Sequence, residues 1–107
     1  MGAVNYFSGI VREGEEGKTI KAINYEAFDK MVLHQFDLIL NEIEERWPIE
    51  SIRLVHRTGT VKVNESSLWI EVISPHRTEA FEACQWLIDE MKKRVPIWKH
   101  PIFTKVD

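Results

Sequence analysis

Ser74-Pro75-His76-Arg77 and, further along, Lys92-Lys93-Arg94-Val95-Pro96-Ile97-Trp98-Lys99 enclose the stretch that decides the fold of this chain. Between them apolar residues recur at helical spacing, which predicts one amphipathic helix. Ser74 is suited to cap this helix with Pro75 at its first position, and Pro96 closes it. The apolar stripe consists of Ala80, Cys84, Leu87, Ile88, Met91 and Val95. Such a stripe must pack against another element, and we expect a sheet.

Cations stand at the start of this helix, where they are least expected. His76 and Arg77 fall in the first turn, where the helix dipole is already positive. A bound phosphate or carboxylate would compensate them, because the free backbone N–H groups of a helix start also attract anions. The alternative is that both side chains are simply solvated, as most surface charges are. The first functional hypothesis is therefore a local anion site.

The basic run at the other end of the helix has two interpretations. Lys92, Lys93 and Arg94 suit a helix C-terminus, so taken alone they fit a solvated, dipole-compatible helix end. Lys99 follows Trp98 beyond Pro96, and this constrained segment could direct its ammonium into a pocket or leave it in solvent. Both interpretations of Lys99 stay open from the residues alone.

Upstream of this helix, segments with alternating apolar residues surround one further segment with helical periodicity. An acidic, glycine-rich loop between the first two alternating segments predicts a hairpin, and Gly59 marks another turn. We predict strands over 3–11, 19–25, 51–57 and 68–73, a helix over 27–47, and a short edge strand over 101–106. With the second helix, the order β-β-α-β-β-α predicts an α+β domain, with two main helices on a largely antiparallel sheet.

Composition limits the class of protein. The chain has 107 residues, 44% of them hydrophobic, which predicts a single domain over 1–107. A formal net charge of −3 argues against a general nucleic-acid binder, so any anion site must be local. No apolar run approaches the length of a membrane span, and a single cysteine fits a reducing compartment. We therefore expect a cytoplasmic protein.

Other chemistry-bearing residues have simpler explanations. Arg12 ends the first strand and could merely pair with the acidic loop that follows it. His56 would share a strand face with Ile52 and Leu54, so we expect a buried structural imidazole rather than a catalyst. Cys84 lies on the apolar stripe, where a buried thiol is more common than a nucleophile.

A metal site is not expected. The four histidines and the cysteine show none of the short paired spacings typical of zinc. What remains is a cationic pocket built from Arg, His and Lys.

The sequence resembles the large, catalytic subunit of molybdopterin synthase over nearly its whole length. The resemblance rests on Gly2-Ala3-Val4 through Phe7-Ser8-Gly9-Ile10-Val11-Arg12, on Ile23-Asn24-Tyr25-Glu26, on Val55-His56-Arg57-Thr58-Gly59, and most strongly on Ser74-Pro75-His76-Arg77-Thr78-Glu79-Ala80-Phe81-Glu82-Ala83 followed by residues 92–99. The last two blocks together are highly specific.

This resemblance implies an α/β-hammerhead fold and a homodimer that forms a heterotetramer with a small ubiquitin-like sulfur-carrier subunit. The carrier's tail ends in a glycine thiocarboxylate, from which sulfur passes to cyclic pyranopterin monophosphate. The product is molybdopterin, the dithiolene that later holds molybdenum or tungsten. No bound cofactor, nucleic acid or membrane is implied.

The resemblance also implies roles for five residues. Arg12, His76 and Arg77 would hold the pterin precursor and its phosphate, and Lys92 and Lys99 match the two active-site lysines of the family. Fixed cations suit this chemistry, because thiocarboxylate and phosphate are anions and a tetrahedral adduct develops further negative charge. We expect Lys92 to be the chemical group and Lys99 the anion anchor.

Two other functions compete with this prediction. The first is a non-catalytic pterin- or carrier-binding homologue with truncated termini, which would bind the carrier without making product. The second is a plain phosphate-binding or regulatory module, which would not bind the carrier at all.

Overall fold

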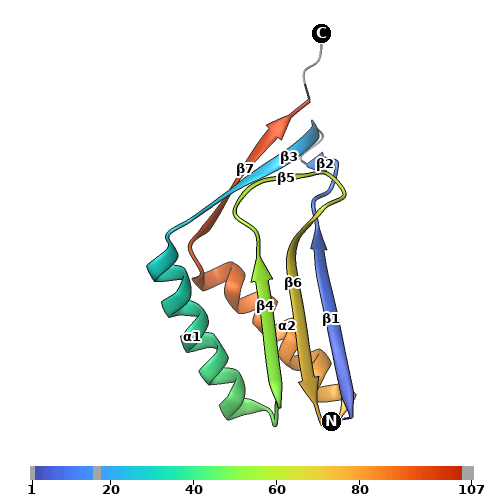
Figure 1. Cartoon of the computed structure of the whole chain (residues 1–107), viewed down its shortest axis with the longest axis vertical. Helices are drawn as coiled ribbons and strands as arrows, with labels where there is room; N and C mark the ends of the chain where they lie inside the picture. Colours follow the sequence, from blue (N-terminus) through green and yellow to red (C-terminus); the bar gives the residue numbers. More distant parts are fainter. Residues whose placement is uncertain (1, 16–17, 105–107) are drawn as a thin grey trace.

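The computed structural model describes residues 2–15 and 18–104 (Figure 1). Seven strands and two helices follow one another along this part of the chain. Their bounds are β1 (Ala3–Ile10), β2 (Gly14–Glu15), β3 (Lys18–Ala27), α1 (Asp29–Arg46), β4 (Ser51–His56), β5 (Gly59–Lys62), β6 (Ser66–Ser74), α2 (Arg77–Arg94) and β7 (Ile97–Phe103). The helices and the principal strands were expected, whereas β5 and the early start of β7 were not.

The strands form two antiparallel sheets that occupy different ends of the molecule. One sheet has the order β1-β6-β4 and lies beside both helices, with Tyr6 opposite Glu71 in its centre (Figure 1). The other has the order β2-β3-β5, with β7 paired to the same strand β3, and crosses the upper end of the first sheet in the view of Figure 1. Two helices packed against antiparallel sheets confirm the predicted α+β class.

The predicted hairpin between the first two long strands is wrong. β1 pairs with β6, while the start of β3 pairs with the two-residue strand β2 on one side and with β7 on the other. The reason is that the two strands bury their apolar residues in different places. Phe7 of β1 packs beside the helices, whereas Ile20 and Ile23 of β3 join Val11 and Val61 in a separate cluster. A single hairpin of β1 and β3 could not place their apolar residues in these two separate clusters.

Two segments of the second sheet differ from the sequence-based expectation. Gly59 has a φ of +80°, a left-handed conformation that favours glycine, and it opens β5 instead of forming only a turn. The last strand begins at Ile97 rather than at Pro101, because residues 97–103 pair with β3 immediately after the helix ends. The predicted strand over 101–106 extends beyond Thr104, outside the described residues.

The main core lies between the helices and the β1-β6-β4 sheet. From α1, Phe36, Ile39 and Ile43 are buried at helical spacing, and from α2, Leu87 and the other stripe residues face them. Ile70 and Val72 of β6 complete this core from the sheet. The predicted stripe of α2 is thus confirmed, with Ile88 only partly buried at its edge.

The start of α2 differs in detail from the prediction. His76, not Ser74, is the N-cap residue, and its side chain makes no capping hydrogen bond. Ser74 instead remains in β6 opposite Ala3, fully buried, with its hydroxyl donating to the His76 carbonyl. Gly2 donates its N–H to the Ser74 carbonyl, and a Cβ on Gly2 would lie 2.0 Å from the Pro75 carbonyl oxygen. A side chain at position 2 would therefore clash with the backbone that leads into α2 at Arg77.

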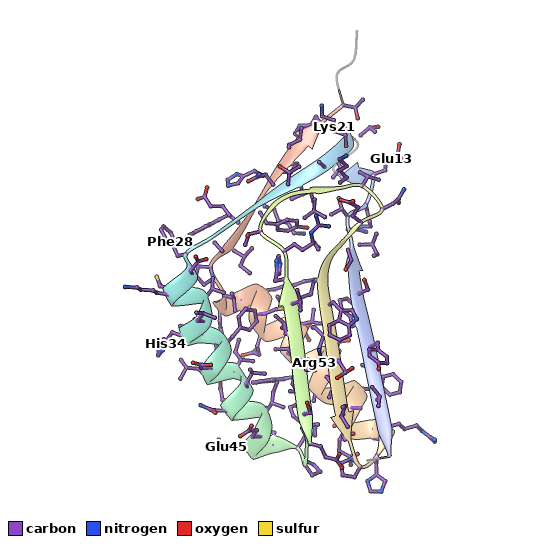
Figure 2. All side chains as sticks on the ribbon, in the orientation of Figure 1. Glu13, Lys21, Phe28, His34, Glu45 and Arg53 are labelled. Carbon is purple, nitrogen blue, oxygen red and sulfur yellow. The ribbon has the colours of Figure 1, made fainter. Side chains whose placement is uncertain are left out.

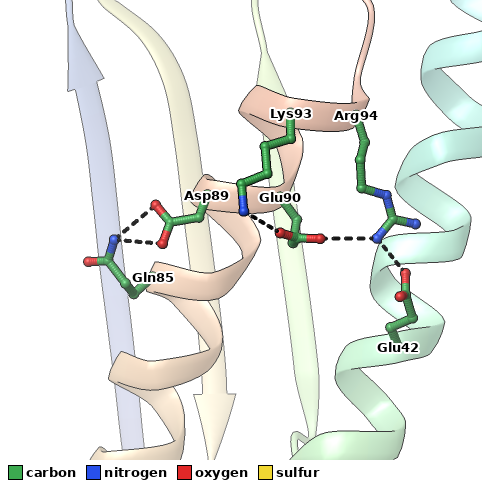
Figure 3. A network of polar contacts seen from close by, with 6 residues as sticks. All are labelled: Glu42, Gln85, Asp89, Glu90, Lys93 and Arg94. Atoms are coloured by element: carbon green, nitrogen blue, oxygen red, sulfur yellow. Dashed lines mark hydrogen bonds and ion pairs between the residues drawn. The ribbon is translucent and has the colours of Figure 1, made fainter.

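The end of α2 is tied to α1 by charge pairs. Arg94 donates to Glu42 of α1 at 2.7 Å and lies 3.4 Å from Glu90, which also pairs with Lys93 (Figure 3). Separately, the Gln85 amide donates to Asp89 one turn away on the outer surface of α2. The basic run predicted as a solvated helix end is therefore partly an interhelical network, and of its three cations only Lys92 stands apart from it.

Cys84 is buried, as expected for a structural thiol. Its thiol is 3% exposed within the main core, and this burial raises its pKa, with a smaller lowering from the hydrogen bond to Asn5. We expect Cys84→Ala to lower the free energy of unfolding by about 1 kcal/mol through the small cavity it leaves. Chemical denaturation measures this change. Complete loss of product formation in a folded Cys84→Ala protein would contradict the structural assignment.

Candidate anion-binding cavity

The junction between the two sheets and the end of α2 contains a cavity of about 800 Å³. Its lining comes from both cores, because β1 and α2 supply one side and β3 and β7 the other. The lining residues are Phe7, Ser8, Gly9, Ile10, Val11, Arg12, Gly14, Ile23, Tyr25, His56, Ser67, Leu68, Ile88, Met91, Lys92, Val95, Ile97 and Lys99. Segments from both ends of the sequence thus meet at one site.

The charge of this cavity has a single sign. Arg12, Lys92 and Lys99 line it, and none of its lining residues is Asp or Glu. Among the side chains that the structure describes, in residues 2–14 and 19–104, no acidic group forms an ion pair with any of these three cations. In a chain with a net charge of −3, this concentration of positive charge favours an anionic ligand.

Each cation is positioned by a buried neighbour. Val11 is anchored in the smaller core, with its N–H on the Glu65 carbonyl and its own carbonyl accepting from Asn64, and Arg12 follows it. Lys92 follows buried Met91 in the last turn of α2. Lys99 lies opposite buried Tyr25 in the β3–β7 pair. The backbone at all three sites is therefore fixed while the charged ends stay exposed.

His56 lies in the same cavity, at the end of β4. It shares its strand face with Ile52 and Leu54 as predicted, and its Nδ1 lies 2.7 Å from the Arg57 carbonyl oxygen. Its ring stands edge-on to Tyr25, with centroids 5.2 Å apart. Burial lowers the pKa of His56, the bond to Arg57 opposes this, and the charge of Lys99 lowers it further.

The expectation that His56 is a purely structural imidazole is therefore incomplete. One ring nitrogen is satisfied, as expected, but the ring also faces the cavity. The sequence held a signal for this in the His56-Arg57 pair, which repeats the His76-Arg77 pair at another strand end. Tyr25 and Ser67 complete the polar lining and were not singled out from the sequence.

The structure does not bring His76 and Arg77 to this cavity within one chain. They lie at the start of α2, and Lys92 lies near its end, so a helical rise of 1.5 Å per residue separates Arg77 from Lys92 by about 22 Å. Nearby negative charge comes from Glu79, whose Oε2 lies 3.9 Å from His76 Nδ1. The predicted cationic residues thus divide into three at the cavity and two at the far end of α2.

Neither a metal-binding cluster nor a membrane-spanning helix is found among the described residues. Within the described residues there is no group of three or more His, Cys, Asp or Glu side chains arranged to hold a metal ion. Across the same residues, no helix is both long and apolar enough to cross a membrane.

Known proteins of similar sequence and fold share one name. The crystal structure titled molybdopterin synthase from Staphylococcus aureus superposes with a TM-score of 0.91 at 37% identity, covering 98% of this chain and 77% of that one. The molybdopterin synthase catalytic subunit of Pyrococcus abyssi is 41% identical over 94% of this chain and 68% of its own length. Catalytic subunit 1 of Aedes aegypti is 46% identical over 92% of this chain.

The chain spans about two thirds of the length of these curated relatives, 68% in Pyrococcus abyssi and 64% in Aedes aegypti. The family model described as MoaE protein matches residues 1–94, which include Arg12, His56 and Lys92. A match over most of the chain, together with relatives above 40% identity and a shared fold, shows that this chain belongs to the MoaE protein family.

Proposed function

We propose that this chain is the catalytic subunit of a molybdopterin synthase. In two rounds it transfers two sulfur atoms to cyclic pyranopterin monophosphate, each from the C-terminal thiocarboxylate of a small ubiquitin-like carrier, producing molybdopterin. In each round water releases the spent carrier with a C-terminal carboxylate. The observation that carries the proposal is a cavity of about 800 Å³ lined by three cations and no carboxylate, in a member of the MoaE protein family. Both reactants carry negative charge, and both must enter one site.

The three cations suit three parts of this reaction. Lys92 stands on the rigid last turn of α2, where it can stabilise the negative charge that develops when thiocarboxylate sulfur adds to the pterin precursor. Lys99, on the opposite side of the cavity in β7, serves as the anchor for an anionic group. Arg12 offers a planar guanidinium, which binds phosphate through two parallel hydrogen bonds. Fixed backbone at each position makes the site preorganised.

The carrier would reach this site with its tail. The charged ends of Lys92 and Lys99 are exposed, so the cavity is accessible to an extended peptide from outside. A terminal thiocarboxylate is negatively charged and has no acidic lining residue to repel it. We propose one carrier per cavity, and a cytoplasmic location for the resulting assembly, which the single free cysteine fits.

A second copy of this chain would bring His76 and Arg77 to the reaction. The surface of the β1-β6-β4 sheet that faces away from the helices, here called the open sheet face, exposes Val4, Tyr6, Ile10 and Val55 and includes Trp69. Tyr6 is 61% and Val55 57% exposed on the two outer strands of this sheet, with Trp69 of β6 between them, and such an exposed group of large apolar side chains is unusual. Arg53, labelled in Figure 2, crosses this face over Trp69 towards Glu71. We propose that two copies pack through it.

A symmetric dimer of this kind would bring all five predicted site residues to one cavity. Ala3, at the start of β1, pairs with Ser74, which is close in sequence to His76 and Arg77. Arg12 lies at the opposite end of β1, two residues after the strand ends. A twofold axis perpendicular to the strands sets the start of β1 in one copy against the end of β1 in the other. His76 and Arg77 of each copy would then face the cavity of its partner, where they would bind the precursor's phosphate.

This arrangement predicts complementation between two defective chains. Arg77→Ala should mainly raise the KM for the precursor, and Lys92→Ala should remove turnover. When the two variants are mixed one to one and refolded together, half of the dimers contain one chain of each kind. In such a hybrid one cavity has both Arg77 and Lys92, and the other has neither. About a quarter of all cavities are then intact, so product formation should recover to roughly a quarter of the wild-type rate. The rate is measured at a precursor concentration well below KM. A mixture no more active than its two components would contradict a shared cavity.

The first experiment is a reconstitution of the whole reaction. The protein is mixed with thiocarboxylated carrier and cyclic pyranopterin monophosphate, and the dithiolene product is followed through its oxidised fluorescent derivative. Product is expected in the wild type. Carrier retained on a sizing column without product would favour the non-catalytic homologue, and no retention at all would favour a plain phosphate-binding module. We also propose that residues 1–107 act as one domain in this assay.

A further inference from the structure

His56 lines the cavity, but the proposed function gives its imidazole no role. Its Nδ1 lies 2.7 Å from the Arg57 carbonyl oxygen. A carbonyl oxygen only accepts hydrogen bonds, so Nδ1 must carry the proton of the neutral ring. The second nitrogen, Nε2, then keeps its lone pair, and no described residue donates to it. The backbone therefore fixes one tautomer of His56.

The charged and titratable groups around this ring come from every neighbouring element. Lys99 lies on β7, Lys92 on α2 and Arg12 after β1, while Tyr25 of β3 packs edge-on against the ring. Arg57, next in sequence, pairs instead with Glu65 at 3.6 Å. The three cations can only donate hydrogen bonds. His56 thus provides a fixed acceptor among fixed donors.

Its surroundings also keep the imidazole neutral. A proton on Nε2 would add a fourth positive charge to a cavity with no carboxylate. Burial, and to a smaller extent Lys99, lowers the pKa of His56 from its usual value of 6.5 despite the bond to Arg57. The ring is therefore uncharged near neutral pH, and Nε2 is available as an acceptor there.

We propose that His56 Nε2 accepts a hydrogen bond from an N–H or O–H group of the pterin precursor, and so selects ligands that combine an anionic group with a donor. This inference rests on the proposed function, because it concerns the same cavity and the same substrate. The cations bind the negative part of the precursor, and His56 orients its neutral part. A simple phosphate ion would satisfy the cations and leave His56 without a donor.

Two variants separate the two nitrogens of His56. In His56→Asn the amide N–H can still donate to the Arg57 carbonyl, but no acceptor remains at the place of Nε2. In His56→Gln the longer side chain carries its amide towards the place of Nε2 and can restore an acceptor. We expect His56→Asn to raise the KM for the precursor roughly tenfold, because a buried donor loses its partner, with a smaller change in kcat. His56→Gln should recover most of this loss.

The dependence on pH adds a readout that a structural role would not change. For the wild type, kcat/KM should fall as the pH decreases through the lowered pKa of His56, because protonation removes the lone pair. At neutral and higher pH this group should cause little further change, since the lowered pKa leaves the ring neutral there. Both variants lack an imidazole at this position, so this acid limb should be absent from their profiles.

Nitrogen NMR of histidine-labelled wild-type protein tests the inference without relying on turnover. We expect the His56 signals of a ring protonated at Nδ1, and a shift of the Nε2 signal when cyclic pyranopterin monophosphate is added but not when inorganic phosphate is added. A ring protonated at Nε2, or an Nε2 signal unmoved by bound precursor, would overturn the inference.

The outcomes distinguish the two proposals. If the wild type makes product and His56→Asn keeps the same KM and the same acid limb, the role of His56 is refuted and the proposed function stands. If the wild type neither binds the precursor nor makes product with an active carrier, the proposed function is refuted, and this inference with it. Circular dichroism of both variants checks that each is folded.

Discussion

Lys92→Ala is expected to lower the rate of product formation by roughly three orders of magnitude while leaving the fold intact. Removal of one preorganised group that stabilises developing negative charge typically costs on the order of 10²–10³ in kcat, and Lys92 is also placed to handle a proton. The fold should survive because the Lys92 side chain is exposed and makes no ion pair with a described residue. Single-turnover formation of the dithiolene measures the effect.

Lys93→Ala is the matched control. It removes the same charge from the neighbouring position of the same helix, but Lys93 pairs with Glu90 on the outside and does not line the cavity (Figure 3). We expect its rate to stay within about twofold of the wild type, since exposed ion pairs contribute little. Equal rates for wild type and Lys92→Ala, or equal losses in both variants, would show that Lys92 has no special role in the chemistry.

Reversal of charge at Lys99 should have the second largest effect. Lys99→Glu places a carboxylate opposite Tyr25, in a cavity that otherwise has only cationic charge. The new carboxylate repels the precursor's phosphate and can pair with Lys92 or Arg12, so it both removes an anchor and neutralises another cation. We expect precursor affinity to fall more than 100-fold, as measured by isothermal titration calorimetry.

Lys21→Glu changes the net charge of the chain by the same amount at a residue that does not line the cavity. Lys21 lies on β3 towards the upper end of the second sheet in Figure 2, and it does not line the cavity. The affinity of Lys21→Glu for the precursor should fall by less than about threefold, because Lys21 is exposed to water and salt, which screen its charge, and it does not contact a ligand in the cavity. A similar loss in both variants would mean that overall charge, and not the cavity, attracts the precursor.

Local patterns predicted the secondary structure well where one face of an element is buried. α1 and α2 follow directly from apolar spacing and from Pro48 and Pro96, and β1, β4 and β6 follow from alternation. Apart from the two-residue strand β2, the missed elements are those whose stability depends on a partner distant in sequence. β5 and the first half of β7 pair only with β3 within the described residues, and neither carries a strong pattern of its own.

The site was only partly predictable for the same reason. Arg12, Lys92 and Lys99 were candidates because of their residue types and the family resemblance, yet each also had an ordinary explanation as a solvated or paired surface charge. The structure distinguishes Lys92 from Lys93 and Arg94, because successive helical positions point in different directions. His56 was predicted to lie in the core because its strand face is apolar. In the structure this face ends at the cavity, so the ring of His56 lines it.

The sequence by itself determined the α+β class, the two amphipathic helices, the buried thiol and the family, because these depend on short-range periodicity and on contiguous motifs. Only the tertiary structure decided that β1 and β3 belong to different sheets, that Arg12, His56, Lys92 and Lys99 share one cavity, and that His76 and Arg77 lie at the far end of α2. The physical reason is that a strand's partner is chosen by long-range packing. A strand's own residues specify which face is buried but not which neighbour covers it.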